Sequence, residues 1–109
     1  MDARLPAHLE VSGMIRRIES EGGFGMVIRK GERDAGTLLI VLQDKGENPR
    51  LYERMPDLDG TRKWHCSKVQ DAENKQDFQD YLDRRLRQDP DSWLIELDIP
   101  NGERFIGIG

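Results

Sequence analysis

The chain has 109 residues, of which 36% are hydrophobic and 35% charged, and its formal net charge is −4. This length is that of one ordinary domain, so we expect a single domain over residues 1–109. The composition excludes a disulfide scaffold, because a lone cysteine, Cys66, cannot close an internal disulfide. A single cysteine also favours a reducing cytoplasm. The longest apolar run, Leu38–Leu42, is too short for a membrane-spanning helix, and no membrane partner is expected.

The first predicted element is a helix over residues 7–21. Its apolar side chains recur at the i, i+3, i+4 and i+7 spacing of one helical face, at Val11, Met14, Ile15 and Ile18. Gly22 and Gly23 end this helix, because glycine adopts the left-handed conformation of a helix C-terminus without a steric penalty. Gly13 either weakens the middle of the helix or marks a close packing contact.

Four strands are expected next. Residues 24–29 alternate between the set Phe24, Met26, Ile28 and the set Gly25, Val27, Arg29, which is typical of a half-buried strand. The run 38–42 is apolar on both faces, which predicts a central strand covered on each side. Further strands are predicted over 51–55 and 62–68. The short connections between the four strands favour an antiparallel meander.

A second helix is predicted from near Asp71 or Asn74 to Gln88, because Pro90 disfavours helical geometry at the residue before it. Residues 93–99 alternate as a strand. The Asn101–Gly102 pair is a hairpin signal and predicts a short final strand over 104–108. The expected order is α-β-β-β-β-α-β-β. It predicts an α+β fold with a mostly antiparallel sheet and helices packed on it.

The order of elements and three local sequences carry a resemblance to a known family. The sequences are Val11–Arg17, Gly31–Gly36 and Asp89–Trp93. They resemble the DUF1491 family of short alphaproteobacterial proteins of unknown function. The resemblance implies a bacterial cytoplasmic protein of one domain. It brings no activity, ligand or catalytic residue to any position of this chain.

The sequence contains no residue pattern that is typical of a catalytic site or a metal site. His65 and Cys66 are adjacent in a predicted strand, so their side chains point to opposite faces and cannot act as a nucleophile–base pair. We expect Cys66 to be a small core residue on the same face as Trp64. Two histidines and one cysteine do not supply a zinc ligand set. We therefore predict no catalytic residue, no metal and no cofactor.

Four cations in the electrically neutral first half of the chain are candidates for binding an anionic ligand. They are Arg16, Arg17, Arg29 and Lys30. Together with Asp34 and Trp93 they could line a pocket for an anion or an acidic partner. The plainer interpretation is that these cations form exposed ion pairs with nearby acids, at Glu19, Glu21, Glu32 and Asp34.

The segment Arg62–Lys68 interleaves cations with Trp64, as surfaces that bind single-stranded nucleic acid do. Arg62, Lys63 and Lys68 would contact the phosphates. The acidic net charge argues against this function. The alternative is an edge strand protected by its lysines, with Trp64 in the core.

The favoured prediction is a small non-catalytic binding or adaptor domain that acts through protein contacts. It rests on the finding that no acid, base, nucleophile and metal ligands meet at a recognisable spacing. A homodimer formed through an edge strand or a sheet face is one form that such contacts could take. A small-ligand protein or enzyme with an anion pocket near Arg16 and Arg29, and a nucleic-acid binder using Arg62–Lys68, are the alternatives.

Overall fold

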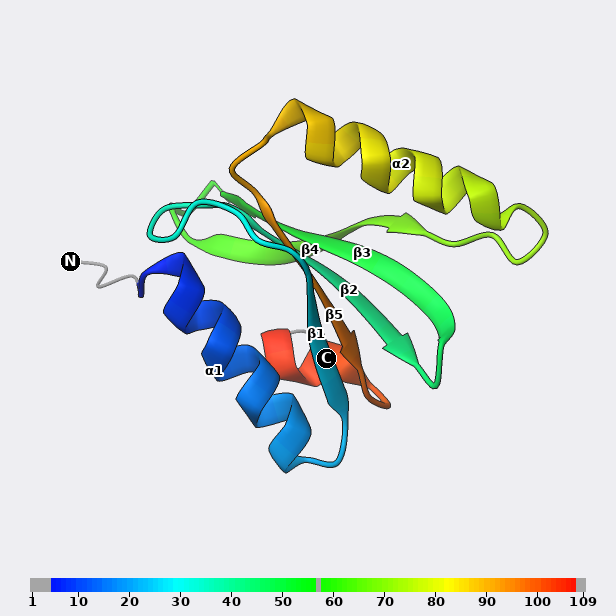
Figure 1. Cartoon of the computed structure of the whole chain (residues 1–109), viewed down its shortest axis with the longest axis horizontal. Coiled ribbons are helices and arrows are strands. Elements are labelled where there is room, and N and C mark those ends of the chain that lie inside the picture. The colour runs from blue at the N-terminus through cyan, green and yellow to red at the C-terminus, as the bar shows by residue number, and fades with distance from the viewer. Residues whose placement is uncertain (1–4, 57, 108–109) are drawn as a thin grey trace.

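The computed structural model describes residues 5–56 and 58–107, and within them it contains two α-helices, five strands and a short 3-10 helix (Figure 1). In chain order the elements are α1 (Ala7–Ser20), β1 (Phe24–Arg29), β2 (Leu38–Asp44), β3 (Glu47–Pro56), β4 (Arg62–Val69), α2 (Lys75–Gln88), β5 (Trp93–Asp98) and η1 (Gly102–Ile106). The predicted α+β class is confirmed, as are both helices and the first five strands of the prediction.

The five strands form one sheet in the order β1-β5-β2-β3-β4. β2 and β5 are parallel, and all other neighbours are antiparallel. The predicted meander is correct for β2, β3 and β4 but wrong for β1, because β5 lies between β1 and β2. The helix α2 makes this arrangement possible, since a parallel neighbour requires a long crossover connection.

Two apolar clusters cover the two faces of the sheet. α1 and η1 cover one face, and α2 covers the other (Figure 1). β2 contributes to both clusters, with Leu38, Ile40 and Leu42 on one side and Leu39 and Val41 on the other. All five of these side chains are at most 5% exposed, which confirms the predicted central strand.

The loop between β1 and β2 fixes the beginning of α1. The backbone N–H of Ala7 donates to the carbonyl oxygen of Asp34 at 2.9 Å, and that of His8 donates to the carbonyl oxygen of Arg33 at 2.9 Å. These bonds satisfy N–H groups that the first turn of a helix leaves without a partner. α1 and the loop over residues 30–36 therefore form one unit at the end of β1.

The predicted final strand over 104–108 is wrong, because the chain forms η1 over Gly102–Ile106; residue 108 lies outside the described residues. Asn101 does adopt the left-handed conformation that its hairpin signal requires, with φ 55°. However, the Glu103 carboxylate accepts hydrogen bonds from Arg50 and Tyr52 of β3. These contacts hold the segment against the sheet as a helical turn. In the described part of the chain, no helix is long and apolar enough to cross a membrane.

Candidate binding surface

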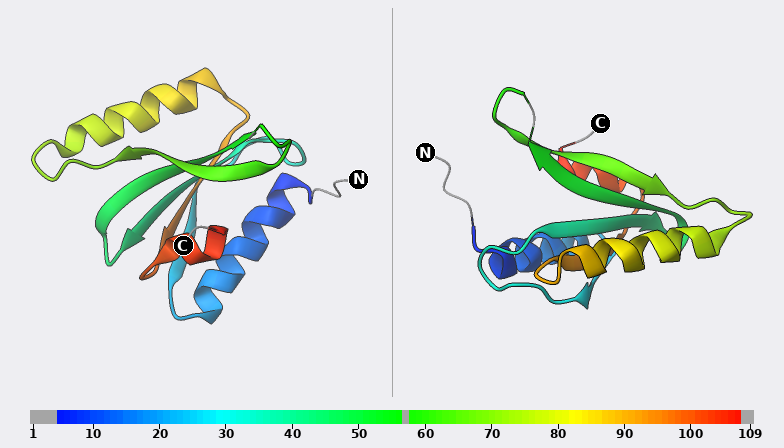
Figure 2. Two further views of the ribbon diagram at one scale, coloured as in Figure 1. Left: turned by 180° about the vertical axis from the view of Figure 1, so that it is seen from behind. Right: turned by 90° about the horizontal axis from the view of Figure 1, so that it is seen from above.

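β1 is an edge strand with an exposed apolar row. It pairs with β5 on one side only. In Figure 2 (right) it runs along the lower margin of the molecule, with no other described element beyond it. Phe24, Met26 and Ile28 are 55%, 42% and 47% exposed. We call these three side chains the β1 row.

Phe24 and Met26 face outward because the other face of β1 is packed against α1, and Ile28 lies at a bulge between Val27 and Arg29. A Cβ atom added to Gly25 would lie 3.0 Å from Cγ1 of Ile15, so α1 approaches this face closely. Val27 packs against the cluster on the α1 side. Phe24 and Met26 must then project from the opposite face, and the cluster beneath α2 contains no side chain of β1.

The other edge strand, β4, carries charges that protect it. It includes Arg62, Lys63 and Lys68, and pairs with β3 alone. Charged side chains on an edge strand discourage pairing with another chain. Trp64 packs against the apolar cluster, and the Arg54 guanidinium stacks 4.8 Å from the centre of its ring. The segment is an edge strand, as the alternative interpretation expects, but Trp64 is only partly buried against the cluster and is not one of its buried residues.

The three nucleic-acid candidates do not gather on one surface. Arg62 lies on the same face of β4 as Trp64, whereas Lys63 lies on the other face. Lys68 bonds to the Asp77 carboxylate at 2.6 Å and lies over the ring of Tyr81. A phosphate backbone therefore meets no continuous row of cations here.

A pocket of about 440 Å³ lies on the α1 side of the β1 edge, between α1 and the loop over residues 30–36. Its lining residues include the apolar side chains Val11, Ile15, Val27 and Trp93 and the basic side chains His8, Lys30 and Arg33. We call it the Trp93 pocket. Trp93 is held in place by its indole N–H, which donates to the carbonyl oxygen of Glu32 at 2.7 Å.

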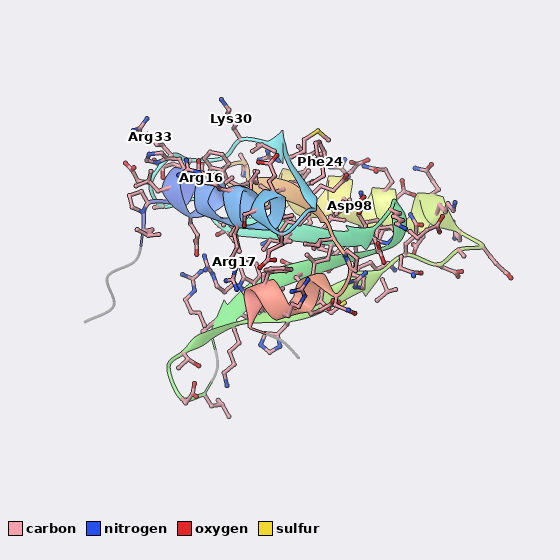
Figure 3. The ribbon with its side chains drawn as sticks, turned by 90° about the horizontal axis from the view of Figure 1, so that it is seen from below. Arg16, Arg17, Phe24, Lys30, Arg33 and Asp98 are labelled. Atoms are coloured by element: carbon pink, nitrogen blue, oxygen red, sulfur yellow. The ribbon has the colours of Figure 1, made fainter. Side chains whose placement is uncertain are left out.

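The surroundings of the Trp93 pocket are basic although the chain is acidic overall. Within residues 5–56 and 58–107, neither Arg16 nor Lys30 forms an ion pair, and Arg33 has only a long contact of 3.9 Å with Asp34. Figure 3 shows Arg16, Lys30 and Arg33 on the side of the molecule that also carries Phe24. This side is therefore complementary to a ligand that is both acidic and apolar.

The structure brings together only part of the predicted ligand set. Lys30 and Trp93 both line the Trp93 pocket, and Arg16 lies exposed on the same side. Arg17 points away, with its guanidinium 5.2 Å from the ring of Phe105 in η1 (Figure 3). Arg29 is turned to the other face of the sheet by a bulge in β1, where it binds backbone carbonyl groups at the end of α2.

Asp34 belongs to a different pocket, of about 1010 Å³, at the beginning of α1. The Arg54 guanidinium in that pocket donates to both oxygens of Glu10, at 2.7 and 2.8 Å. The expected ion pairs of Arg16, Arg17, Arg29 and Lys30 with neighbouring acids are absent from the described residues. The plainer interpretation of these cations is therefore wrong for all four.

Sequence reasoning missed His8 and Arg33, and no local signal could have found them. Both reach the pocket because the first turn of α1 bonds to the loop after β1, which is a contact between distant segments. The β1 row did have a signal. Gly25 inside a strand marks a close approach by another element, and that element identifies the covered face.

Cys66 and His65 occupy neighbouring positions in β4, opposite Tyr52 and Glu53. Their side chains therefore lie on opposite faces of the strand, as expected. The prediction that Cys66 is a core residue is wrong, because its side chain is exposed. The apolar cluster on that face extends to Trp64 and does not include Cys66. Among the residues that the structure describes, no group of three or more His, Cys, Asp and Glu side chains could hold a metal ion.

The strongest pKa shifts lie away from the β1 edge. Hydrogen bonds from Arg50 lower the pKa of Glu103 to about 2. Burial, with the Glu103 carboxylate beside it, raises the pKa of Tyr52 to about 12. The three side chains form a bonded network that joins η1 to β3, so we assign these shifts to a structural role.

Comparison with known proteins agrees with this fold. A family model described as a protein of unknown function (DUF1491) matches residues 5–107. The chain belongs to the DUF1491 family. The crystal structure of a DUF1491 family protein from Caulobacter crescentus CB15 is similar, with a TM-score of 0.82 and 32% identity over 96% of this chain and 97% of that one.

Two solution structures are also similar. An NMR structure of a DUF1491 family protein from Caulobacter crescentus CB15 has a TM-score of 0.77 and 33% identity, over 95% of this chain and 94% of that one. The solution structure of protein Atu0922 from A. tumefaciens has a TM-score of 0.76 and 24% identity, over 96% of this chain and 94% of that one. The latter shows a shared fold alone. No curated protein matches the chain. The function must therefore be argued from the surface of this DUF1491 protein.

Proposed function

We propose that this DUF1491 protein is a non-catalytic binding domain of the cytoplasm, which receives an extended segment of a polypeptide along β1. The observation that supports the proposal is the exposed β1 row on a strand whose outer edge has no partner among the described elements. An open edge offers backbone N–H and C=O groups to an added strand. Side chains of the row supply the apolar contact that makes such pairing favourable.

The bound segment must satisfy two kinds of chemistry. Its side chains next to the β1 row must be apolar, because Phe24, Met26 and Ile28 leave roughly half of their surfaces in water. At the end of β1 that leads into the loop, Lys30 and Arg33 favour an acidic side chain. We therefore expect a β-strand that alternates apolar residues and carries an acidic residue at one end.

A site-specific photo-crosslinking experiment tests the proposal. A photoreactive amino acid replaces Phe24, and in a matched control it replaces Val69, which is 57% exposed on the protected edge strand β4. In host cells, irradiation should crosslink a polypeptide to position 24 and form no crosslink at position 69. Absence of a protein crosslink at position 24, or equal yields at both positions, contradicts the proposed function.

The Trp93 pocket supports a second candidate function, which is binding of a small carboxylate with an apolar body. The specific observation is an apolar lining beside Lys30 and Arg33 in a pocket of about 440 Å³. A Trp64→Phe variant leaves Trp93 as the only tryptophan, so that its fluorescence reports on the pocket. Octanoate should change this fluorescence more than octanol does, and Arg33→Ala should weaken the response. Equal responses to both compounds exclude a carboxylate site.

A further inference from the structure

A narrow apolar groove of about 240 Å³ runs between α1 and η1. We call it the α1–η1 groove. It shares no described lining residue with the Trp93 pocket, and the proposed function does not use it. Its apolar lining includes Leu5, Leu9, Met14, Leu97, Phe105 and Ile106. We propose that this groove binds a free amphiphile, which consists of a single acyl chain that ends in a carboxylate.

The groove is apolar at one end and cationic at the other. Leu9, Gly13 and Arg17 all line it, and their spacing of four residues places them along one side of α1. Leu9 and Arg17 are eight positions apart, which at 1.5 Å per residue is about 12 Å along the helix axis. At the apolar end, Leu5 and Leu9 are 62% and 48% exposed. The groove therefore has the polarity of a molecule with an apolar tail and an anionic head.

Gly13 keeps the middle of the groove open. It lies within α1 and lines the groove, and a Cβ atom added to it would meet nothing within 4 Å. A glycine in a helix interior destabilises the helix relative to alanine. No contact among the described residues requires glycine at this position. A chain that passes along the helix backbone does require it, because a larger side chain would fill the space that the chain occupies.

Two guanidinium groups stand at the cationic end. The guanidinium carbons of Arg17 and Arg104 lie 5.2 and 4.2 Å from the centre of the Phe105 ring, and Figure 3 shows Arg17 beside η1. Neither arginine forms an ion pair with another described residue. Because two like charges at one ring repel each other, an anion beside them is favoured. A carboxylate also accepts charge-assisted hydrogen bonds from guanidinium N–H groups.

The size and the remaining charge of the groove define the ligand further. Pockets for drug-sized ligands measure about 300–1,000 Å³, so this smaller groove suits one narrow chain rather than a fused ring system. Among its described lining residues, Glu10 is the only acid. Its carboxylate accepts hydrogen bonds from Arg54 at 2.7 and 2.8 Å, and this ion pair compensates its charge. The tail therefore lies past Glu10 at the Leu9 end, and the head lies at Arg17.

Nuclear magnetic resonance of the purified chain, titrated with decanoate below its micelle-forming concentration, tests the inference. Decanoate should shift the backbone amide signals of Gly13 and Phe105 with one common dissociation constant. Decanol has the same chain without the charge and should bind about tenfold more weakly, because it lacks the hydrogen bonds between charged groups. Absence of saturable shifts at these two amides, or equal affinities for decanoate and decanol, overturns the inference.

Two substitutions, each with a matched control, locate the ligand in the groove. Gly13→Leu fills the groove and should abolish the decanoate shift at Phe105, whereas Glu19→Leu adds a leucine to the same helix outside the groove and should not. Arg17→Gln should weaken decanoate binding about tenfold without changing that of decanol, and Arg16→Gln should change neither. Arg17 is exposed, so its replacement tests the groove even if Gly13→Leu does not fold. Unchanged decanoate affinity in Arg17→Gln contradicts the inference.

Vesicles distinguish a free amphiphile from a membrane surface. Phosphatidylglycerol vesicles present acyl chains and anionic head groups together in one surface. Because the groove takes one chain lengthwise, we expect the protein to stay in solution when such vesicles are sedimented, while it still binds monomeric decanoate. Sedimentation with the vesicles overturns the assignment of a free amphiphile as the ligand.

Discussion

The Arg29 guanidinium binds the carboxyl end of α2, with Nη1 donating to the carbonyl oxygen of Leu86 at 3.0 Å. Nη2 donates to the carbonyl oxygens of Asp89, at 3.1 Å, and of Pro90. A cation at this end also complements the helix dipole. A side chain that the sequence suggests as a ligand for anions thus links β1 to α2 across the sheet.

Replacing Arg29 should therefore destabilise the fold. Arg29→Ala removes the donors for three carbonyl groups, and we expect the free energy of unfolding to fall by about 2 kcal/mol. Lys30→Ala is the matched control, because Lys30 forms no ion pair with a described residue, and its stability should change by less than about 0.5 kcal/mol. Urea unfolding measures both. Equal unfolding free energies for the two variants would show that the hydrogen bonds of Arg29 do not stabilise the fold.

Two glycines should respond oppositely to alanine. A Cβ atom on Gly31 would collide with the backbone of Asp91 and Ser92, so Gly31→Ala should lower the unfolding free energy by about 2 kcal/mol or more. Around Gly13, in the middle of α1, nothing lies within 4 Å of an added Cβ atom. Gly13→Ala should raise the unfolding free energy by about 0.5–1 kcal/mol. Thermal unfolding of both variants tests the contrast, and destabilisation by Gly13→Ala would imply a packing contact there.

The Glu103 network should make stability depend on pH in the acidic range. The pKa of Glu103 is lowered in the folded chain to about 2 from an ordinary value of 4.5. Its ionised form therefore stabilises the fold fully above pH 4.5, and this contribution is lost as the pH falls towards 2. Glu103→Gln should lower the free energy of unfolding by about 1–2 kcal/mol at neutral pH, and by less at pH 3. If the unfolding free energies of Glu103→Gln and the unmodified protein differ by the same amount at every pH, the stabilising role of the ionised Glu103 is contradicted.

Cys66 should react with a thiol reagent in the native state. Its side chain is exposed on β4, and its Sγ atom makes only a long contact of 3.8 Å with the carbonyl oxygen of Lys68. Without denaturant, an aromatic disulfide reagent should modify one thiol per chain at nearly the rate of the unfolded chain. Strong protection against the reagent would indicate that another molecule covers this part of β4.

Local patterns predicted most of the elements, because each depends on the residues within it. The apolar spacing of Val11, Met14, Ile15 and Ile18 identified α1, and the continuous run over 38–42 identified the central strand. The Asn101–Gly102 pair predicted a hairpin and a final strand, which is wrong. The contacts of Glu103 with β3 hold that segment as the helical turn η1. The position of β5 between β1 and β2 likewise depends on packing between distant parts of the chain.

The candidate surface was predictable only in part, for the same reason. Alternation in β1 identified two faces but not which one α1 covers, and the answer depends on the approach of Ile15 to Gly25. Lys30 and Trp93 were expected to share a site and do share a pocket. Arg29 was expected there too, but a bulge in β1 turns it to the other face. A one-residue irregularity in a strand is not visible in its alternation.

Amide hydrogen exchange along the two edge strands tests the central claim most directly. We expect that adding host-cell extract to the purified protein slows exchange of the outward-facing amides of β1. Those of β4, the other edge, should be unaffected, and Met26→Lys should abolish the change in β1. Exchange in β1 that stays equally fast when host extract is added would contradict the claim that this edge is a binding surface.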